Sequence, residues 1–182
     1  MKTVMLVGDS IRIGYQDKVK AKLEGKANVI FPWENCRFSK YTLWGMHEWV
    51  TNLGVIPDII HWNSGIWDHH RITADGEVFT PIHEYVRDCN RLYTEMKKYT
   101  DKLIWATTIP GKNPDPWNKE IDEYNKVVVE LYKSKGDVVI NDLYSVINSD
   151  IEKYICEDLV HLTQEGEEVC ANAVVRHVEM FL

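Results

Sequence analysis

The chain has 182 residues, of which 45% are hydrophobic and 27% charged, a composition typical of one globular domain with a core of its own. Its net charge of −7 argues against nucleic acid or an anionic membrane as the main partner, and no apolar run approaches the roughly 20 residues of a membrane-spanning helix. The four cysteines are scattered without CxxC spacing, and a strand is expected from about residue 3, so we expect no disulfide framework, no signal peptide and a cytoplasmic location.

Strands and helices alternate along the chain, and no repeat, low-complexity tract or linker divides residues 1–182, so we expect a single domain. Short apolar runs predict five strands, at residues 4–7, 28–31, 57–63, 102–106 and 138–140. Apolar residues at three- and four-residue spacing predict helices over about 15–23, 43–53, 82–96, 121–131 and 163–181. Loops are expected at 64–81 and 107–117. This alternation predicts an α/β fold, a three-layer α/β/α sandwich with a five-stranded parallel sheet in flavodoxin-like order.

The first predicted strand ends in Gly8-Asp9-Ser10, directly before the first predicted helix. In open α/β sheets, ligands bind at the carboxyl ends of the strands, where the N–H groups of a following helix favour negative charge. Ser10 is therefore open to two interpretations, as a cap of that helix or as a nucleophile. The tripeptide alone favours the cap, because short motifs match by chance.

A second polar motif, Asp-Leu-Val-His at residues 158–161, precedes the last predicted helix, which Thr163 would cap. A serine nucleophile needs a base, and the base needs a carboxylate that orients it. Asp158 and His161 are three residues apart, so one turn can bring their side chains together. Alone, this motif indicates an ordinary polar loop. In combination with Gly-Asp-Ser at the same edge of the sheet, it predicts a triad of Ser10, His161 and Asp158.

These motifs resemble the SGNH, or GDSL, hydrolase family over nearly the full length of the chain. Gly8-Asp9-Ser10 resembles the family's first block, and residues 158–161 resemble its last block, Asp-x-x-His. The resemblance implies the SGNH hydrolase fold, with Ser10 as nucleophile, His161 as base and Asp158 as its partner. It also implies esterase, lipase, thioesterase or carbohydrate deacetylase activity, for which we expect neither a cofactor nor a metal.

The two middle blocks of the family are altered here, and both concern donors of the oxyanion hole. The second block has a glycine whose N–H is one of these donors. Cys36 takes the position of this glycine and has an N–H of its own, so it is interpreted as the donor. The alternative interpretations of Cys36 are a small loop residue and a reactive thiol. The third block, Gly-x-Asn-Asp, matches Gly65 and Asp68, but Trp67 replaces its asparagine. Asn63 lies two residues before Gly65, on the same side of an extended chain, and is interpreted as the missing amide donor or as a strand-end cap.

Other residues of the predicted edge are candidates for substrate binding. An aromatic wall that includes Trp67 suits sugar rings or acyl groups. Arg12 follows the nucleophile closely and could hold an anionic or polar substrate group, although a solvated or salt-bridged arginine is the commoner case. Asp68-His69-His70 suggests a metal site, but adjacent histidines rarely bind one ion and no HxH or HExxH spacing is present.

The leading hypothesis is therefore a serine ester hydrolase that acts on a small-molecule ester through an acyl-enzyme, with an acyl group on a sugar or another polar alcohol as the preferred substrate. A non-catalytic ligand-binding protein of the same fold, with a degenerate oxyanion hole, is the first alternative. The second is a metal-dependent phosphoester hydrolase that uses Asp9, Asp68 and nearby histidines. The sequence makes no prediction of the oligomeric state.

Overall fold

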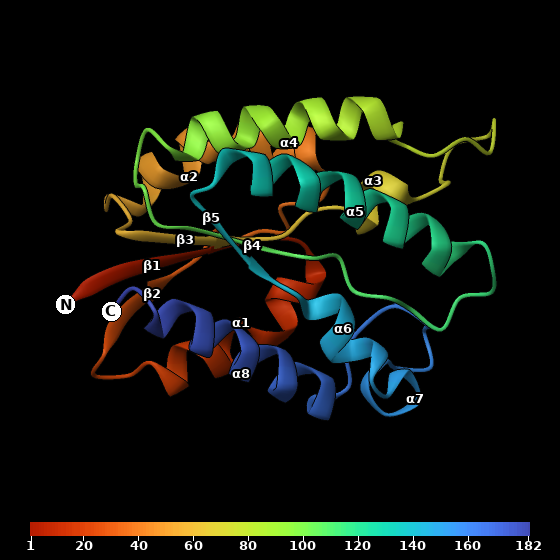
Figure 1. Ribbon diagram of the computed structural model, residues 1–182. Helices are drawn as coiled ribbons and strands as arrows, with labels where there is room; N and C mark the ends of the chain where they lie inside the picture. The colour runs from red at the N-terminus through yellow and green to blue at the C-terminus, as the bar shows by residue number, and fades with distance from the viewer.

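The computed structural model describes all 182 residues and is built on one five-stranded sheet (Figure 1). Its strands are β1 (Lys2–Val7), β2 (Ala27–Ile30), β3 (Ile59–Trp62), β4 (Leu103–Ala106) and β5 (Val138–Asn141). All neighbouring strands are parallel and lie in the order β2-β1-β3-β4-β5. The predicted fold class is therefore confirmed, including its flavodoxin-like strand order.

Two layers of helices cover the sheet, one on each face (Figure 1). On one face lie α1 (Ser10–Lys22), α6 (Leu143–Asn148), α7 (Ile151–Tyr154) and α8 (Gln164–Glu179). On the other lie α2 (Ser39–Leu53), α4 (Ile82–Met96) and α5 (Trp117–Lys135). Successive side chains of a strand point to opposite faces of the sheet. Val4 and Leu6 therefore pack in the core beneath α1 and α8, while Met5 and Val7 pack in the core beneath α2, α4 and α5.

Three short helices, α3 (Ile66–His69), α6 and α7, lie in segments where no helix was predicted. Each has six residues or fewer, which is too short to show helical periodicity in the sequence. No helix is both long and apolar enough to cross a membrane. The four cysteines are all free thiols.

The register of the central strands positions the candidate site. Val7 pairs with Trp62 at the ends of β1 and β3, and the Asn63 N–H donates to the Val7 carbonyl at 3.1 Å. The residues that follow these strands therefore lie side by side at the carboxyl edge of the sheet. In Figure 1, α3, the start of α5 and α7 gather at this edge.

Candidate active site

Ser10 is the first residue of α1 and follows β1 after only two residues. The helix is capped by its neighbour, because Asp9 Oδ1 accepts the N–H of Ile11 at 3.0 Å. The Ser10 side chain does not make this capping bond, and it stays half-buried at the edge of the sheet. Asp9 thus takes the capping role, and the Ser10 hydroxyl is not used for it.

The side chains of Ser10, His161 and Asp158 form a continuous chain of hydrogen bonds. His161 Nε2 lies 3.0 Å from Ser10 Oγ, and His161 Nδ1 lies 2.7 Å from Asp158 Oδ2. These residues are up to 151 positions apart in the sequence, so the fold brings them together. A hydroxyl, an imidazole and a carboxylate in this order are the geometry of an activated serine nucleophile.

Asp158 is held in place by its own turn. Its Oδ1 accepts the backbone N–H groups of Val160 at 3.1 Å and of His161 at 2.9 Å. The His161 N–H is the largest cause of a lowered pKa of Asp158, which falls to about 2, with further contributions from the Val160 N–H and the His161 ring. Asp158, half of whose side chain is exposed, is therefore ionised at neutral pH.

A contact with a distant loop holds the same turn in place, and no sequence pattern indicates this contact. Leu159 has a positive φ of 73°, and its carbonyl accepts the Lys112 N–H at 2.9 Å and the Asn113 amide at 3.1 Å. Gly111 makes this approach feasible, because a Cβ there would lie 2.5 Å from the Leu159 carbonyl oxygen. The loop that precedes α5 therefore supports the turn that carries Asp158 and His161.

Asn63 packs against Gly8 and Asp9, and Gly65 packs against Thr108. Asn63 is buried and donates from its amide to Asp9 Oδ1 at 3.1 Å, which leaves its second amide proton free of this bond. Gly8 permits this packing, since any Cβ at that position would overlap the Asn63 side chain. Gly65 has a φ of +143°, and a Cβ there would overlap Thr108 Oγ1. Gly65 is thus needed for the tight turn after β3.

Cys36 does not offer the free N–H that its match to the family's glycine predicts. It is fully buried, and its backbone N–H donates to the Gly8 carbonyl at 3.1 Å. Burial is the main cause that raises the pKa of its thiol to about 11, which argues against the reactive-thiol alternative. The next residue, Arg37, has a positive φ of 51°. Because it bonds to Gly8, the Cys36 N–H is not free to act as an oxyanion donor in this structure.

Arg12 is also not placed as expected for a substrate-binding residue. It is one of the largest fully buried side chains, and its guanidinium donates to the carbonyls of Gly8 at 3.1 Å, Pro32 at 3.3 Å and Glu34 at 2.6 Å. These bonds tie the loop before α2 to Gly8, in the loop that carries Ser10. Arg12 therefore holds the two loops together from within the protein. Residue spacing alone does not show whether a helical residue such as Arg12 is exposed.

The segment around Trp67 forms the next part of the edge. Trp67 is half-buried on α3, and its ring centroid lies 5.8 Å from that of His70. Asp68 is fully buried and accepts both the N–H of Ser39 at 2.9 Å and its hydroxyl at 2.6 Å, which joins α3 to the start of α2. Burial raises the pKa of Asp68 to about 6, despite these bonds.

The residues of the metal-dependent alternative do not converge in the structure. Asp9 caps α1, Asp68 bonds to Ser39, and His69 pairs with Glu120. No group of three or more His, Cys, Asp or Glu side chains is placed to hold a metal ion.

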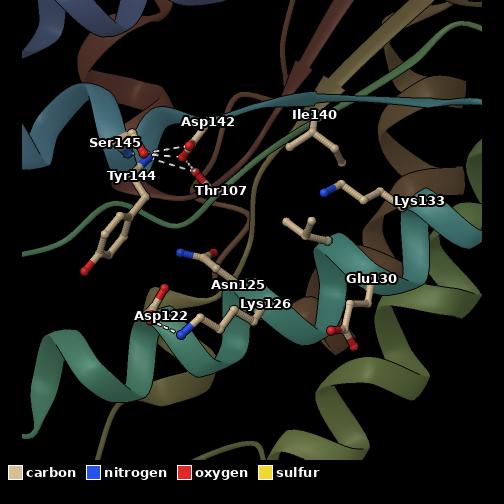
Figure 2. Close-up of a pocket in the computed structure, with 11 residues that line it drawn as sticks. Thr107, Asp122, Asn125, Lys126, Glu130, Lys133, Ile140, Asp142, Tyr144 and Ser145 are labelled. Atoms are coloured by element: carbon tan, nitrogen blue, oxygen red, sulfur yellow. Dashed lines mark hydrogen bonds and ion pairs between the residues drawn. The ribbon is translucent and has the colours of Figure 1, made fainter.

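A large groove lies away from the triad, between α5, β5 and α6 (Figure 2). Its volume is about 610 Å³, and its lining is dominated by polar and charged side chains. Several of these bond to one another: Thr107 donates to Asp142, and Lys126 pairs with Asp122. None of Ser10, Asp158 and His161 lines it, so its size does not make it the candidate site.

No protein-family model and no curated protein matches the sequence. Among solved structures, an acetylxylan esterase from Geobacillus stearothermophilus has 19% identity and a TM-score of 0.81 over 97% of this chain and 94% of its own. A lipase/acylhydrolase from Enterococcus faecalis has 19% identity and a TM-score of 0.82 over 100% and 97%. An α/β hydrolase enzyme from the metagenome of Lake Arreo, Spain, has 18% identity and a TM-score of 0.81 over 97% and 94%. The chain thus has the fold of these hydrolases, in agreement with the SGNH/GDSL resemblance.

Proposed function

We propose that this protein is a serine ester hydrolase of the SGNH/GDSL type, acting on a small-molecule ester. The observation that carries the proposal is the hydrogen-bonded chain from Ser10 through His161 to Asp158, at 3.0 Å and 2.7 Å. The likeness to esterases and acylhydrolases supports it through the fold.

In the proposed mechanism, Ser10 Oγ attacks the ester carbonyl and His161 Nε2 accepts the hydroxyl proton. The Asp158 carboxylate holds the ring in the required tautomer and stabilises the imidazolium that forms. The tetrahedral intermediate collapses when His161 gives the proton to the leaving alcohol, and the acyl group stays on Ser10. A water molecule, deprotonated by His161, then releases the acid. Because the chain supplies both nucleophile and base, the reaction requires no cofactor.

The oxyanion hole of this proposal differs from the one that the sequence suggested. The N–H of Ser10, at the start of α1, has no partner within its helix and is aided by the helix dipole. The second amide proton of Asn63 is the other candidate donor. With the Cys36 N–H already bonded to Gly8, the hole lacks a donor, and one missing donor typically costs about 10²–10³ in rate. We therefore expect slow turnover.

Hydrolysis of acetyl esters by wild type, Ser10→Ala and His161→Ala tests the proposal. Turnover that is lost in both variants, and that continues with a chelator present, is the expected result. Ordinary turnover by Ser10→Ala would exclude this mechanism.

A non-catalytic binding protein is the second candidate, favoured by the bonded Cys36 N–H and by Trp67 in place of an asparagine. It predicts that a folded wild type binds an acylated ligand without hydrolysing it, and without any dependence on Ser10.

A further inference from the structure

A second, smaller cavity lies at the same edge of the sheet as the triad and has no role in the proposed chemistry; none of Ser10, Asp158 and His161 lines it. It has a volume of about 320 Å³, close to the lower end of small-molecule sites. The residues of its lining that matter here are His69, His70, Arg71, Pro116, Trp117 and Glu120. They come from α3, the loop after it and the start of α5.

The cavity is connected to the triad through the loop before α5. A Cβ on Gly111 would lie 2.5 Å from the Leu159 carbonyl oxygen and 3.2 Å from Trp117 Nε1, so the Asp-x-x-His turn and the Trp117 indole are neighbours. On the other side, the His70 ring lies between Trp117, at 5.5 Å, and Trp67, at 5.8 Å. The rings of Trp117, His70 and Trp67 therefore follow one another from the Asp-x-x-His turn to α3.

Aromatic rings and one ion pair form the binding surface of the cavity. Trp117 packs edge-on against His69 at 4.6 Å, which fixes the orientation of its indole. Glu120 accepts from His69 Nε2 at 2.6 Å and from Arg71 at 2.5 Å, so its carboxylate is held in one place. The carboxylate is partly exposed and keeps further acceptor capacity, while Arg71 brings additional donors.

The charges of the cavity cancel. Glu120 and Arg71 neutralise each other, and burial lowers the pKa of both His69 and His70, which keeps the two rings uncharged at neutral pH. An anion or a cation would find no uncompensated counter-charge here. A neutral ligand with an apolar ring face and several hydroxyl groups matches the aromatic wall, the fixed acceptor and the nearby donors.

We propose that this cavity is the subsite for the alcohol part of the substrate, and that it binds one neutral sugar ring. The inference rests on the proposed esterase function, because it assigns the leaving group of that reaction. Trp117 and His70 contact the ring, and the hydroxyl groups of the sugar bond to Glu120 and Arg71.

The test compares two acetyl esters, a methyl glucoside carrying one acetyl group and ethyl acetate, which has the same acyl group and no ring. Glu120→Gln is expected to lower the ratio of kcat/KM for the sugar ester to that for ethyl acetate by about tenfold, the size of one hydrogen bond to a charged group. Trp117→Leu is expected to lower the same ratio. Glu123→Gln, at an exposed position of the same helix, is the matched control and leaves the ratio at its wild-type value. An unchanged ratio in Glu120→Gln and Trp117→Leu would overturn the subsite.

Binding separates this inference from the proposed reaction. In the Ser10→Ala background, the acetylated methyl glucoside is expected to shift a tryptophan indole signal in the NMR spectrum saturably, and Glu120→Gln weakens this binding. Wild type that hydrolyses neither ester would reject the esterase, while the binding measurement still decides on the subsite. Absence of saturable binding to Ser10→Ala, in a protein that hydrolyses ethyl acetate, would reject the sugar subsite alone.

Discussion

Replacement of Asp158 by asparagine changes one oxygen of the triad to an NH₂ group and is expected to reverse the tautomer of His161. Oδ1 of Asp158 accepts two backbone N–H groups, and Oδ2 accepts from His161 Nδ1 at 2.7 Å. In Asp158→Asn, the amide oxygen keeps the two backbone bonds, because the opposite orientation would set an NH₂ against two N–H donors. The NH₂ then faces His161 Nδ1 and donates to it.

This donation moves the ring proton to His161 Nε2, which lies 3.0 Å from Ser10 Oγ and can no longer accept its proton. The same exchange in other triads lowers kcat by about 10⁴, and we expect a loss of this order here. KM and thermal stability are expected to change little, since half of the Asp158 side chain is exposed.

The assay is the steady-state hydrolysis of ethyl acetate followed by acid release, together with the thermal unfolding midpoint of each variant. Glu157→Gln serves as the matched control, because Glu157 is the fully exposed neighbour of Asp158. A kcat of Asp158→Asn within tenfold of wild type would show that Asp158 does not set the tautomer of His161.

Three further substitutions test the supports of the site. In Gly111→Ala the new Cβ would lie 2.5 Å from the Leu159 carbonyl oxygen, so the turn that carries Asp158 and His161 must shift, and kcat is expected to fall about hundredfold; an unchanged kcat would contradict this. Arg12→Ala leaves buried carbonyls without donors and is expected to lower the urea-measured free energy of unfolding by about 3 kcal/mol, whereas a change in KM alone would restore its role in substrate binding. Because the pKa of Asp68 rises from 3.8 to about 6 on folding, the folded state binds the proton more tightly between these values, and wild-type stability falls by about 3 kcal/mol as the pH rises through them. Asp68→Asn lacks this titration, so an identical pH dependence of unfolding in the variant would refute the assignment.

The parts of the site that sequence reasoning reached are those that depend on local spacing. Ser10 ends a buried strand and begins a helix, and Asp158 and His161 are three residues apart, so each motif can be recognised without knowing the fold. The strand order follows from alternating strands and helices, because right-handed crossovers leave few alternatives.

The remaining features depend on tertiary contacts or on backbone angles. Sequence reasoning favours a solvated or salt-bridged Arg12, and only the carbonyls that surround it explain its burial. The bond of the Cys36 N–H to the Gly8 carbonyl joins two separate loops, and residue identity does not predict it. The support of Leu159 by the loop at Gly111 joins segments about 50 residues apart, and no local pattern marks it.

The central claim is that Ser10 is an activated nucleophile, and covalent labelling tests it most directly. Wild type and Ser10→Ala are incubated with a fluorophosphonate in the presence of a chelator, and the intact mass of each is measured. The account predicts a single adduct on wild type that is absent from Ser10→Ala. A folded wild type that gains no adduct would contradict the account, and the non-catalytic binding protein would then become the leading hypothesis.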